Sequence, residues 1–299
     1  MKHGCMLLMV NSKILLISII LFLIPGCTVA VDHNWHREAV WYQIFPERFR
    51  NGDTSNDPTI EALKGTWPYD KQKEWAVTPW TDQWYKLQPW EINNSEGFYY
   101  NAQLRRYGGD IQGIIDKLDY LEDLGINAIY LNPVFESPSS HKYGAQYFHH
   151  IDNNFGPDPE GDELIWSLEE PSDPNTWKWT SADLLFLKLI KEVHKRNMHI
   201  IIDGVFNHVG IPFWALVEVR KNGKDSPYAE WFNITSWDDP ATPEDEFDYE
   251  GWFGIKDLPE LAETENNLAD PVKDHIKAIV SRWMDPNGDG DPSDGIDGW

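Results

Sequence analysis

The sequence predicts an α/β fold built on a parallel β-sheet, and two observations indicate it. Short apolar segments suited to strands alternate with segments whose apolar residues recur every three or four positions, as on one face of a helix. The clearest strand is HIII at residues 199–202, followed by DGVFNH. A continuous apolar run of this kind is typical of a strand that helices cover on both faces. We therefore expect Ile201 to be as buried as its neighbours.

Two further strands precede this one in the chain. Residues 39–46 (AVWYQIFP) are typical of a first strand, and residues 126–135 (INAIYLNPVF) of a second. A helical pattern lies before each of the two later strands, which is the order of βαβ units.

Three helices are predicted from apolar spacing and from their end signals. The first begins at Asp110, ends at Gly125 and presents Ile111, Ile114, Ile115, Leu118, Leu121 and Leu124. The second is capped by Ser181, ends near Asn197 and is expected to bury Leu184, Leu185, Leu187, Ile190 and Val193. The third runs to about Asp285 and starts with Asp270 as N-cap and Pro271 in the first turn.

Composition limits the kind of ligand. The 299 residues include 49 acidic and 25 basic side chains, a formal net charge of −24. This charge argues against nucleic acid and against adsorption to anionic membrane surfaces, and it suits a neutral ligand or a calcium ion. Sixteen Trp and twelve Tyr mildly favour a saccharide, since sugar rings stack on aromatic faces, although most aromatic side chains fill a core.

Residues 1–27 are predicted to be an export signal. Lys2 and Lys13 precede an apolar run at 14–24 that is too short to span a bilayer, and the segment ends in Pro25-Gly26-Cys27. It resembles a bacterial lipoprotein signal, in which the Cys is lipidated after cleavage. The protein is then exported, either as a cell-envelope lipoprotein that touches the membrane only through Cys27 or, because Pro25 departs from the pattern, as a secreted protein. A buried N-terminal helix is the remaining alternative.

Two loops carry side chains suited to binding. Asp203, Asn207 and His208 follow the strand at 199–202, at the end where α/β barrels bind ligands. The alternative is a turn in which Asp and Asn bond only the backbone. Earlier, four oxygen-bearing side chains lie close together on one loop, at Asn51, Asp53, Asn56 and Asp57. Such a loop suits Ca²⁺, and a turn that bonds its own backbone is again the alternative.

Several segments, in the same order along the chain, resemble the α-amylase family (glycoside hydrolase 13), most closely its neopullulanase and cyclomaltodextrinase branch. They are YQIFPERF at 42–49, GGD at 108–110, HKY at 141–143, D-x-V-x-N-H at 203–208 and GIDGW at 295–299. The resemblance implies the N-terminal part of a (β/α)8 TIM barrel, with strands 1–3 and an inserted small B domain. It divides the chain into a signal (1–27), the first part of the barrel (28–209), the B domain (210–269) and a helix leading to strand 4 (270–299), so that the barrel is incomplete.

The resemblance also implies residue roles. Ca²⁺ would be held by Asn51, Asp53, Asn56, Asp57, the Gly108 carbonyl and Asp110. Tyr143 would stack on the sugar at the cleavage point, His208 would hydrogen-bond it, and Asp203 would orient an Arg and a nucleophile expected just beyond Trp299. Gly144 departs from the family, which has Asp there. His149 and His150 are expected to be packing residues, because their spacing fits no metal-ligand pattern.

The implied function is retaining hydrolysis of α-1,4-glucosidic bonds in starch fragments or cyclodextrins by the intact protein, with an α-glucan oligosaccharide as its partner. Such enzymes need two carboxyl groups at the cleavage point. No carboxylate of this chain stands at a matching position, so the 299-residue chain itself is expected to be inactive. A non-catalytic saccharide-binding lipoprotein or a relic of a barrel is the alternative.

Overall fold

The structure, a computed structural model, describes residues 34–69 and 74–299. The chain divides into two compact units, residues 1–37 and 38–299. Of the first unit it describes residues 34–37, with the short helix η1 (Trp35–Arg37). The predicted export signal, residues 1–27 with Cys27, lies outside the described residues. Within the described part, no helix combines the length and apolar character needed to cross a membrane.

Three parallel strands form the central sheet of the second unit. They are β1 (Trp41–Ile44), β2 (Ala128–Leu131) and β3 (His199–Ile202), in the order β1-β2-β3. Ile44, Leu131 and Ile202 stand side by side in the register. These strands confirm the prediction of a parallel α/β sheet. At the outer edge of β3, Gly298 forms a parallel bridge with Ile201, so the chain begins to add a neighbour to β3 there.

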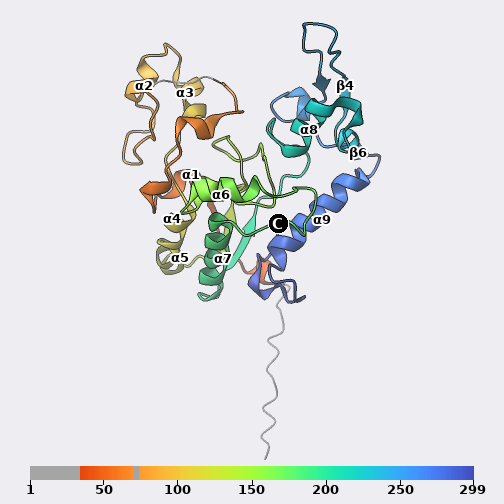
Figure 1. Ribbon diagram of the computed structural model, residues 1–299. Coiled ribbons are helices and arrows are strands. Elements are labelled where there is room, and N and C mark those ends of the chain that lie inside the picture. Colours follow the sequence, from red (N-terminus) through yellow and green to blue (C-terminus); the bar gives the residue numbers. More distant parts are fainter. Residues whose placement is uncertain (1–33, 70–73) are drawn as a thin grey trace, which may run out of the picture. The chain divides into compact units, whose positions relative to one another are not determined.

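Four helices pack around the sheet (Figure 1), namely α4 (Ile111–Ile115), α5 (Leu118–Asp123), α7 (Ser181–His194) and α9 (Asp270–Met284). The single helix predicted from Asp110 to Leu124 is wrong in one respect, because it is broken between α4 and α5. Lys117 leaves helical geometry, with φ −108° and ψ 1°. The apolar spacing survives the break, since Ile111, Ile114, Leu118 and Leu121 are all buried.

The predicted details of α7 need two corrections. Its N-cap is Thr180, whose hydroxyl accepts from the backbone N–H of Asp183, whereas Ser181 donates to Asp162 at 3.0 Å. Leu184 is 55% exposed, because it lies on the opposite side of the helix from the buried face. That face consists of Ala182, Asp183, Phe186, Leu189, Ile190 and Val193.

The N-cap of α9 is Ala269 rather than Asp270. Asp270 is the first helical residue, where its carboxylate still favours the positive end of the helix dipole, and Pro271 occupies the first turn as predicted. The buried face of α9 carries Val272, His275, Ile279 and Trp283.

The two faces of the sheet are not equally covered. Ile200 and Ile202 are fully buried, but Ile201 is partly exposed, so the expectation that β3 is covered on both faces is wrong for the described residues. The reason is geometric, since alternate side chains of a strand point to opposite faces. Tyr130, beside Ile201 in the register, is also only partly buried.

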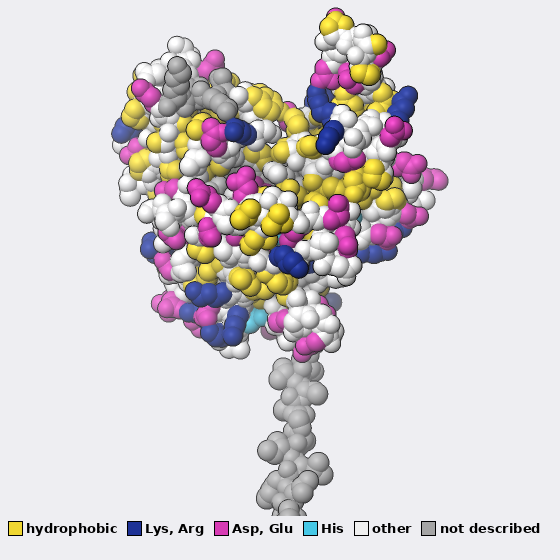
Figure 2. All heavy atoms as spheres, viewed as in Figure 1, with side chains coloured by type: hydrophobic (Ala, Val, Ile, Leu, Met, Phe, Trp, Pro, Cys, Tyr) yellow, Lys and Arg dark blue, Asp and Glu magenta, His cyan; other side chains and the backbone are white. Residues whose placement is uncertain are grey.

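Three long segments leave the carboxyl ends of the strands. After β1, residues 54–104 form an excursion with its own small core of Leu63, Trp90 and Leu104. After β2, the loop continues into α6 (Pro159–Trp166), and after β3 residues 210–269 form an insert with α8 (Trp214–Asn222). Figure 1 shows α2 and α3 of the excursion opposite α8 and β4 of the insert. Figure 2 shows hydrophobic side chains gathered in the hollow between these two lobes.

The remaining elements are short. They are α1 (Pro46–Phe49), η2 (Thr54–Asn56), η3 (Ile60–Leu63), α2 (Pro89–Ile92), α3 (Phe98–Leu104), η4 (Asn153–Phe155), η5 (Gly223–Asp225), η6 (Ala229–Trp231), β4 (Ile234–Ser236), β5 (Asp248–Tyr249), η7 (Trp252–Gly254), β6 (Glu263–Thr264), β7 (Asn267–Leu268) and η8 (Pro292–Asp294). In the insert, β4 pairs with β5 and β6 with β7, both antiparallel.

Candidate functional site

A chain of hydrogen bonds crosses the carboxyl ends of the three strands. Tyr143 lies in the loop after β2, and Asp203 directly follows β3. The Tyr143 hydroxyl donates to Asp203 Oδ2 at 2.8 Å. Asn132 Nδ2 donates to the same hydroxyl at 3.1 Å, and Gln43 Nε2 of β1 donates to Asn132 Oδ1 at 3.0 Å. Burial and the Asp203 carboxylate raise the pKa of Tyr143 to about 12, so its hydroxyl stays a donor at neutral pH.

His208 lies beside this chain of bonds. Its side chain is buried and stacks on Trp252, with ring centroids 5.0 Å apart and planes 28° apart. Within the described residues, neither ring nitrogen has a hydrogen-bond partner. Burial lowers the pKa of His208, and the backbone of Tyr143 opposes this only in part. The lowered pKa favours the neutral imidazole, which can donate one hydrogen bond and accept another.

The structure thus brings together the three predicted binding residues. Tyr143 and Asp203 are in direct contact, and the backbone of Tyr143 faces His208. A pocket of about 200 Å³ is lined by sequence neighbours of Tyr143, although not by the three residues themselves. Its walls are residues 65–67 and Gln103 of the excursion, 138–141 of the loop after β2, Gly144, Gly210, and Ile255, Asp257 and Leu258 of the insert. Gly210 must be glycine, because a Cβ there would collide with the Gly144 carbonyl.

The predicted calcium residues also converge. Asn51 Nδ2 donates to Asp57 Oδ1 at 2.5 Å. The Asp110 carboxylate accepts from the backbone N–H groups of Gly52 and Asp53, at 3.0 and 2.8 Å. Gly108 has φ 71°, and a Cβ on it would collide with Asp57 and Asn51. The 51–57 loop and the GGD segment therefore form one close-packed oxygen-rich cluster.

This cluster leaves oxygen atoms without partners. Asn51 Oδ1 and Asn56 Oδ1 are buried and accept no hydrogen bond within the described chain. Burial raises the pKa of Asp57, and the nearby Asp110 and Asp53 carboxylates raise it further. Buried unpaired carbonyl oxygens beside repelling carboxylates are the donor set that suits a hard divalent cation.

Asp53 differs from the other predicted ligands, because its Oδ1 is engaged in a turn. Its carboxylate accepts from the backbone N–H and hydroxyl of Ser55, at 2.9 and 2.6 Å, and caps η2. Only its backbone N–H reaches Asp110. The turn-forming alternative therefore describes the side chain of Asp53, whereas Asn51, Asn56 and Asp57 turn toward the cluster.

Glu47 is a residue of this region that sequence reasoning missed. It is 2% exposed, and its carboxylate accepts from the backbone N–H groups of Tyr107 and Gly108, at 2.5 and 3.2 Å. Burial raises its pKa to about 7. Glu47 thereby fixes the turn that presents the Gly108 carbonyl. An acid within the apolar YQIFPERF segment was the available signal.

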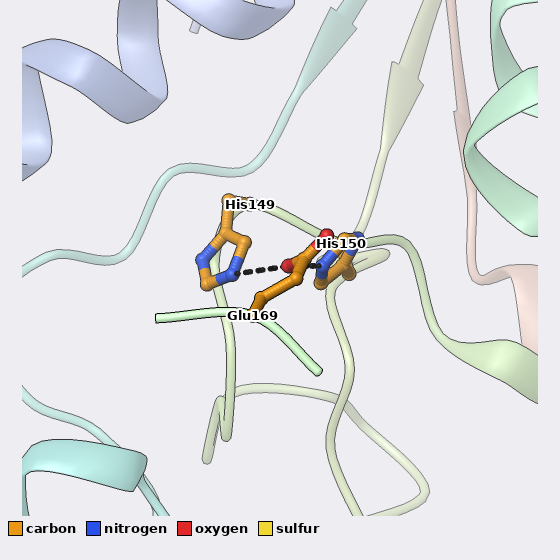
Figure 3. Close-up of side chains that lie close together, drawn as sticks. All are labelled: His149, His150 and Glu169. Atoms are coloured by element: carbon orange, nitrogen blue, oxygen red, sulfur yellow. Dashed lines mark hydrogen bonds and ion pairs between the residues drawn. The ribbon is translucent and has the colours of Figure 1, made fainter. Parts of the chain in front are cut away.

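A second polar cluster, which sequence reasoning also missed, joins His149 and His150 to Glu169. Figure 3 shows the Glu169 carboxylate between the two imidazoles, at 2.8 Å from His150 Nε2 and 3.7 Å from His149 Nε2. In the described part of the chain, this is the one group of three His, Cys, Asp or Glu side chains placed closely enough to hold a metal ion. The expectation that His149 and His150 are simple packing residues is therefore incomplete.

The charges of this cluster are balanced without a metal. His150 Nδ1 lies 2.9 Å from Asp183, so both of its nitrogens face carboxylates. Although burial opposes it, these two carboxylates raise the pKa of His150 to about 9. Arg282 lies 3.2 Å from Asp183 and supplies a second positive charge. Two cations facing two anions favour an ion-pair network that ties the loop after β2 to α7 and α9.

Most of the sequence matches a known family. The description "Alpha amylase, catalytic domain" applies to residues 43–171 and 181–298, which include the end of β1, all of β2 and β3, and the Tyr143, Asp203 and His208 site. The chain belongs to the α-amylase family. Its sheet and helices are accordingly the first part of a TIM barrel with an inserted segment after the third strand, and the described residues do not close that barrel.

Relatives by sequence carry the names of α-glucan hydrolases. "Neopullulanase 2" of Thermoactinomyces vulgaris is 35% identical over 270 residues, which cover 89% of this chain and 34% of that protein. "Cyclomaltodextrinase" of Thermoanaerobacter pseudethanolicus is 37% identical over 204 residues, or 68% of this chain and 25% of that protein. The chain therefore spans about a third or less of the length of these relatives.

A solved structure agrees with this assignment. The "Cyclic alpha-maltosyl-(1-->6)-maltose hydrolase from Arthrobacter globiformis" superposes with a TM-score of 0.57 at 30% identity and covers 89% of this chain and 44% of that one. The same enzyme has also been solved in complex with maltose. Family and branch are thus those that the sequence motifs predicted.

Proposed function

We propose that the complete protein hydrolyses α-1,4-glucosidic bonds in starch fragments or cyclodextrins with retention of configuration. The observation that supports this most directly is the joining of Tyr143, Asp203 and His208 at the strand ends, in a chain of the α-amylase family. The open hollow above the sheet, with hydrophobic surface along it, suits a ligand that is neutral and has apolar ring faces.

Each of the three residues has a role in this proposal. His208, in the neutral form that burial favours, donates a hydrogen bond to a sugar hydroxyl at the cleavage point. The ring of Tyr143 lies under the same sugar, held in place through its hydroxyl by Asp203 and Asn132. Asp203 accepts from the Tyr143 hydroxyl, also contacts the Tyr130 side chain, and in this proposal orients residues of the following strand.

The two carboxyl groups that do the chemistry are the part of the proposal this chain does not supply. One attacks the anomeric carbon and the other protonates the leaving oxygen, about 5 Å away in retaining enzymes. We therefore expect the 299-residue chain alone to show no turnover of maltoheptaose. Heat of binding without turnover would favour the alternative, a saccharide-binding protein, for this chain, and neither signal would favour a relic.

The decisive test is hydrolysis by the complete protein. Maltoheptaose and β-cyclodextrin are offered separately, and the anomer released first is identified by proton NMR. The expected result is cleavage that releases the α-anomer. His208→Gln should lower kcat/KM about a hundredfold, as for loss of one donor to the transition state. Tyr99→Phe, on an exposed ring of α3, is the matched control and should leave the rate unchanged.

We further propose that Ca²⁺ binds between the 51–57 loop and Gly108–Asp110. Asn51, Asn56, Asp57, Asp110 and the Gly108 carbonyl would hold it, with Asp53 at the rim. The ion would neutralise the clustered carboxylates and fix the ends of β1 and α4. Removing it with EGTA should lower the melting temperature, and re-adding Ca²⁺ should restore it.

The position of Asp53 gives this calcium proposal a sharp control. Asp57→Asn should weaken Ca²⁺ binding strongly, because it removes a charge at the centre of the cluster. Asp53→Asn should weaken it much less, since that carboxylate caps η2 instead. Equal losses in isothermal titration would contradict the ligand assignment, and a melting temperature indifferent to EGTA would contradict the site.

We also propose that the protein is exported through residues 1–27, as a lipoprotein modified at Cys27 or as a secreted protein. The short apolar run and the Cys at its end support this. Mass spectrometry of the mature N-terminus distinguishes the two forms, because only the lipoprotein begins with a diacylglycerol-modified Cys27. Retention of an unprocessed Met1 inside the cell would overturn both.

A further inference from the structure

Phe253, in the short helix η7 of the insert, has a backbone conformation and an exposure that packing does not explain. Its backbone has φ 50° and ψ 29°, the left-handed region that bulky side chains disfavour. Its ring is 84% exposed, so burial does not offset the cost of this conformation. A glycine would satisfy the turn better, as Gly254 does next to it with φ 79°.

The loop that carries Phe253 is closed by backbone hydrogen bonds. Gly251 pairs with Pro259 in an antiparallel bridge, and Trp252 N–H donates to the Leu258 carbonyl at 2.9 Å. Within this 251–259 loop, Gly254 N–H donates to the Gly251 carbonyl at 2.7 Å and Leu258 N–H to the Ile255 carbonyl at 3.0 Å. The exposed Phe253 ring therefore lies on a loop that backbone hydrogen bonds hold in one conformation.

The same loop is attached to the candidate active site. Val209 N–H donates to the Pro259 carbonyl at 2.9 Å, and His208 pairs with Glu260. Trp252 stacks on His208, and the ring of Phe253 lies 4.5 Å from that of Trp252. Phe253 is thus linked to the His208 imidazole through the ring of Trp252.

We propose that Phe253 is a specificity-determining residue, whose exposed ring stacks on a glucose unit of the α-glucan next to the unit bound at Tyr143 and His208. The inference rests on the proposed hydrolase function. One face of a glucopyranose ring carries C–H groups that pack on an aromatic face. Ile255 and Leu258 of the same loop line the pocket beside His141 and Gly144, so the glucan meets apolar surface on that side as well.

The stacking role predicts a dependence on chain length. A short substrate that ends at the cleavage point does not reach Phe253, whereas maltoheptaose does. Loss of the ring should therefore weaken binding of the long substrate and leave binding of the short substrate unchanged. A purely structural role for Phe253 would affect both substrates alike and would lower the melting temperature.

The test compares Phe253→Gly, Phe253→Trp and wild type in the complete protein, with Tyr99→Ala as an exposed-aromatic control on α3. Phe253→Gly removes the ring and relieves the backbone conformation, so its melting temperature should equal or exceed that of wild type. Its KM for maltoheptaose should rise about three- to tenfold, and its kinetics on p-nitrophenyl α-D-glucopyranoside, which has a single glucose unit, should stay unchanged. Phe253→Trp should restore the maltoheptaose KM.

Two results would overturn the inference while leaving the proposed function intact. One is wild-type cleavage of maltoheptaose with an unchanged KM in Phe253→Gly. The other is an equal loss on both substrates. If wild type cleaves neither maltoheptaose nor β-cyclodextrin, the proposed function fails first and the inference falls with it.

Discussion

Single buried histidines in this protein take opposite charge states according to their neighbours. His149 and His275 are surrounded by aromatic rings, and burial lowers their pKa values to about 3 and about 4. His150, beside His149 in the sequence, faces Asp183 and Glu169, which raise its pKa to about 9. Adjacent residues of one type therefore differ because the fold surrounds them differently.

The raised pKa of His150 predicts a loss of stability on the alkaline side. The unfolded pKa of histidine is about 6.5. A histidine with a higher pKa in the folded state contributes its full stabilisation at pH values below the unfolded pKa. The contribution is lost as the pH rises from about 6.5 through about 9, and it amounts to a few kcal/mol. Urea unfolding at pH 6.5 and pH 9 measures the difference.

The control for this prediction is His150→Gln. It should be less stable than wild type at pH 6.5, because Asp183 and Glu169 lose a cation and keep only Arg282 nearby. Its stability should then change little between pH 6.5 and pH 9. If the unfolding free energies of wild type and variant fall equally between pH 6.5 and pH 9, another group causes the loss and the assignment to His150 is wrong.

At the scale of elements, the strands and helices that depend on local sequence pattern were predicted from the sequence. The three strands follow from apolar runs, whereas the shared site of Tyr143, Asp203 and His208 was implied by the family resemblance. The cap of α7 was misassigned because Thr180 and Ser181 both offer a hydroxyl, and Asp162, distant in sequence, decides between them. The His150 network could not be predicted, since Glu169 comes from a loop without periodicity.

The excursion after β1 illustrates an element held by one buried ion pair. Arg105 donates to both Glu91 oxygens, at 2.5 and 2.6 Å, and to the Trp84 and Lys86 carbonyls, at 2.7 and 2.8 Å. Both charged side chains are almost fully buried. The guanidinium therefore joins α2 to the chain before it and to the end of α3, in a segment whose own apolar core is small.

Arg105→Ala should open this excursion while the barrel strands stay folded. Removing one partner of a buried pair costs roughly 3–5 kcal/mol, because the other charge remains buried and unpaired. Limited proteolysis should then cut within residues 60–104 well below the melting temperature. Arg50→Ala is the matched control, because its pair with Asp116 spans 3.6 Å and is largely exposed, so it should cost less than about 1 kcal/mol. Similar protease resistance of both variants would contradict the prediction.

At the scale of the whole molecule, charge separates the two proposed ligands. The chain carries a formal net charge of −24. The electrostatic field of this charge attracts Ca²⁺. Salt screens the field, and the screening length is about 10 Å at 0.1 M ionic strength. The proposed glucan is neutral and would be bound through ring faces and hydrogen bonds at Tyr143, His208 and Phe253, so the field would not steer it.

Raising NaCl from about 0.05 M to about 0.5 M should therefore weaken Ca²⁺ binding several-fold and change the maltoheptaose Kd by less than about twofold. Isothermal titration of each ligand across this range, with Ca²⁺ saturating in the glucan series, measures the two dependences separately. A sulfated maltoheptaose is the control, because its negative charges meet the same repulsive field and its binding should strengthen with salt. A maltoheptaose Kd that tracks the salt concentration would mean that the glucan site depends on charge, which the neutral His208 and the aromatic rings around it do not provide.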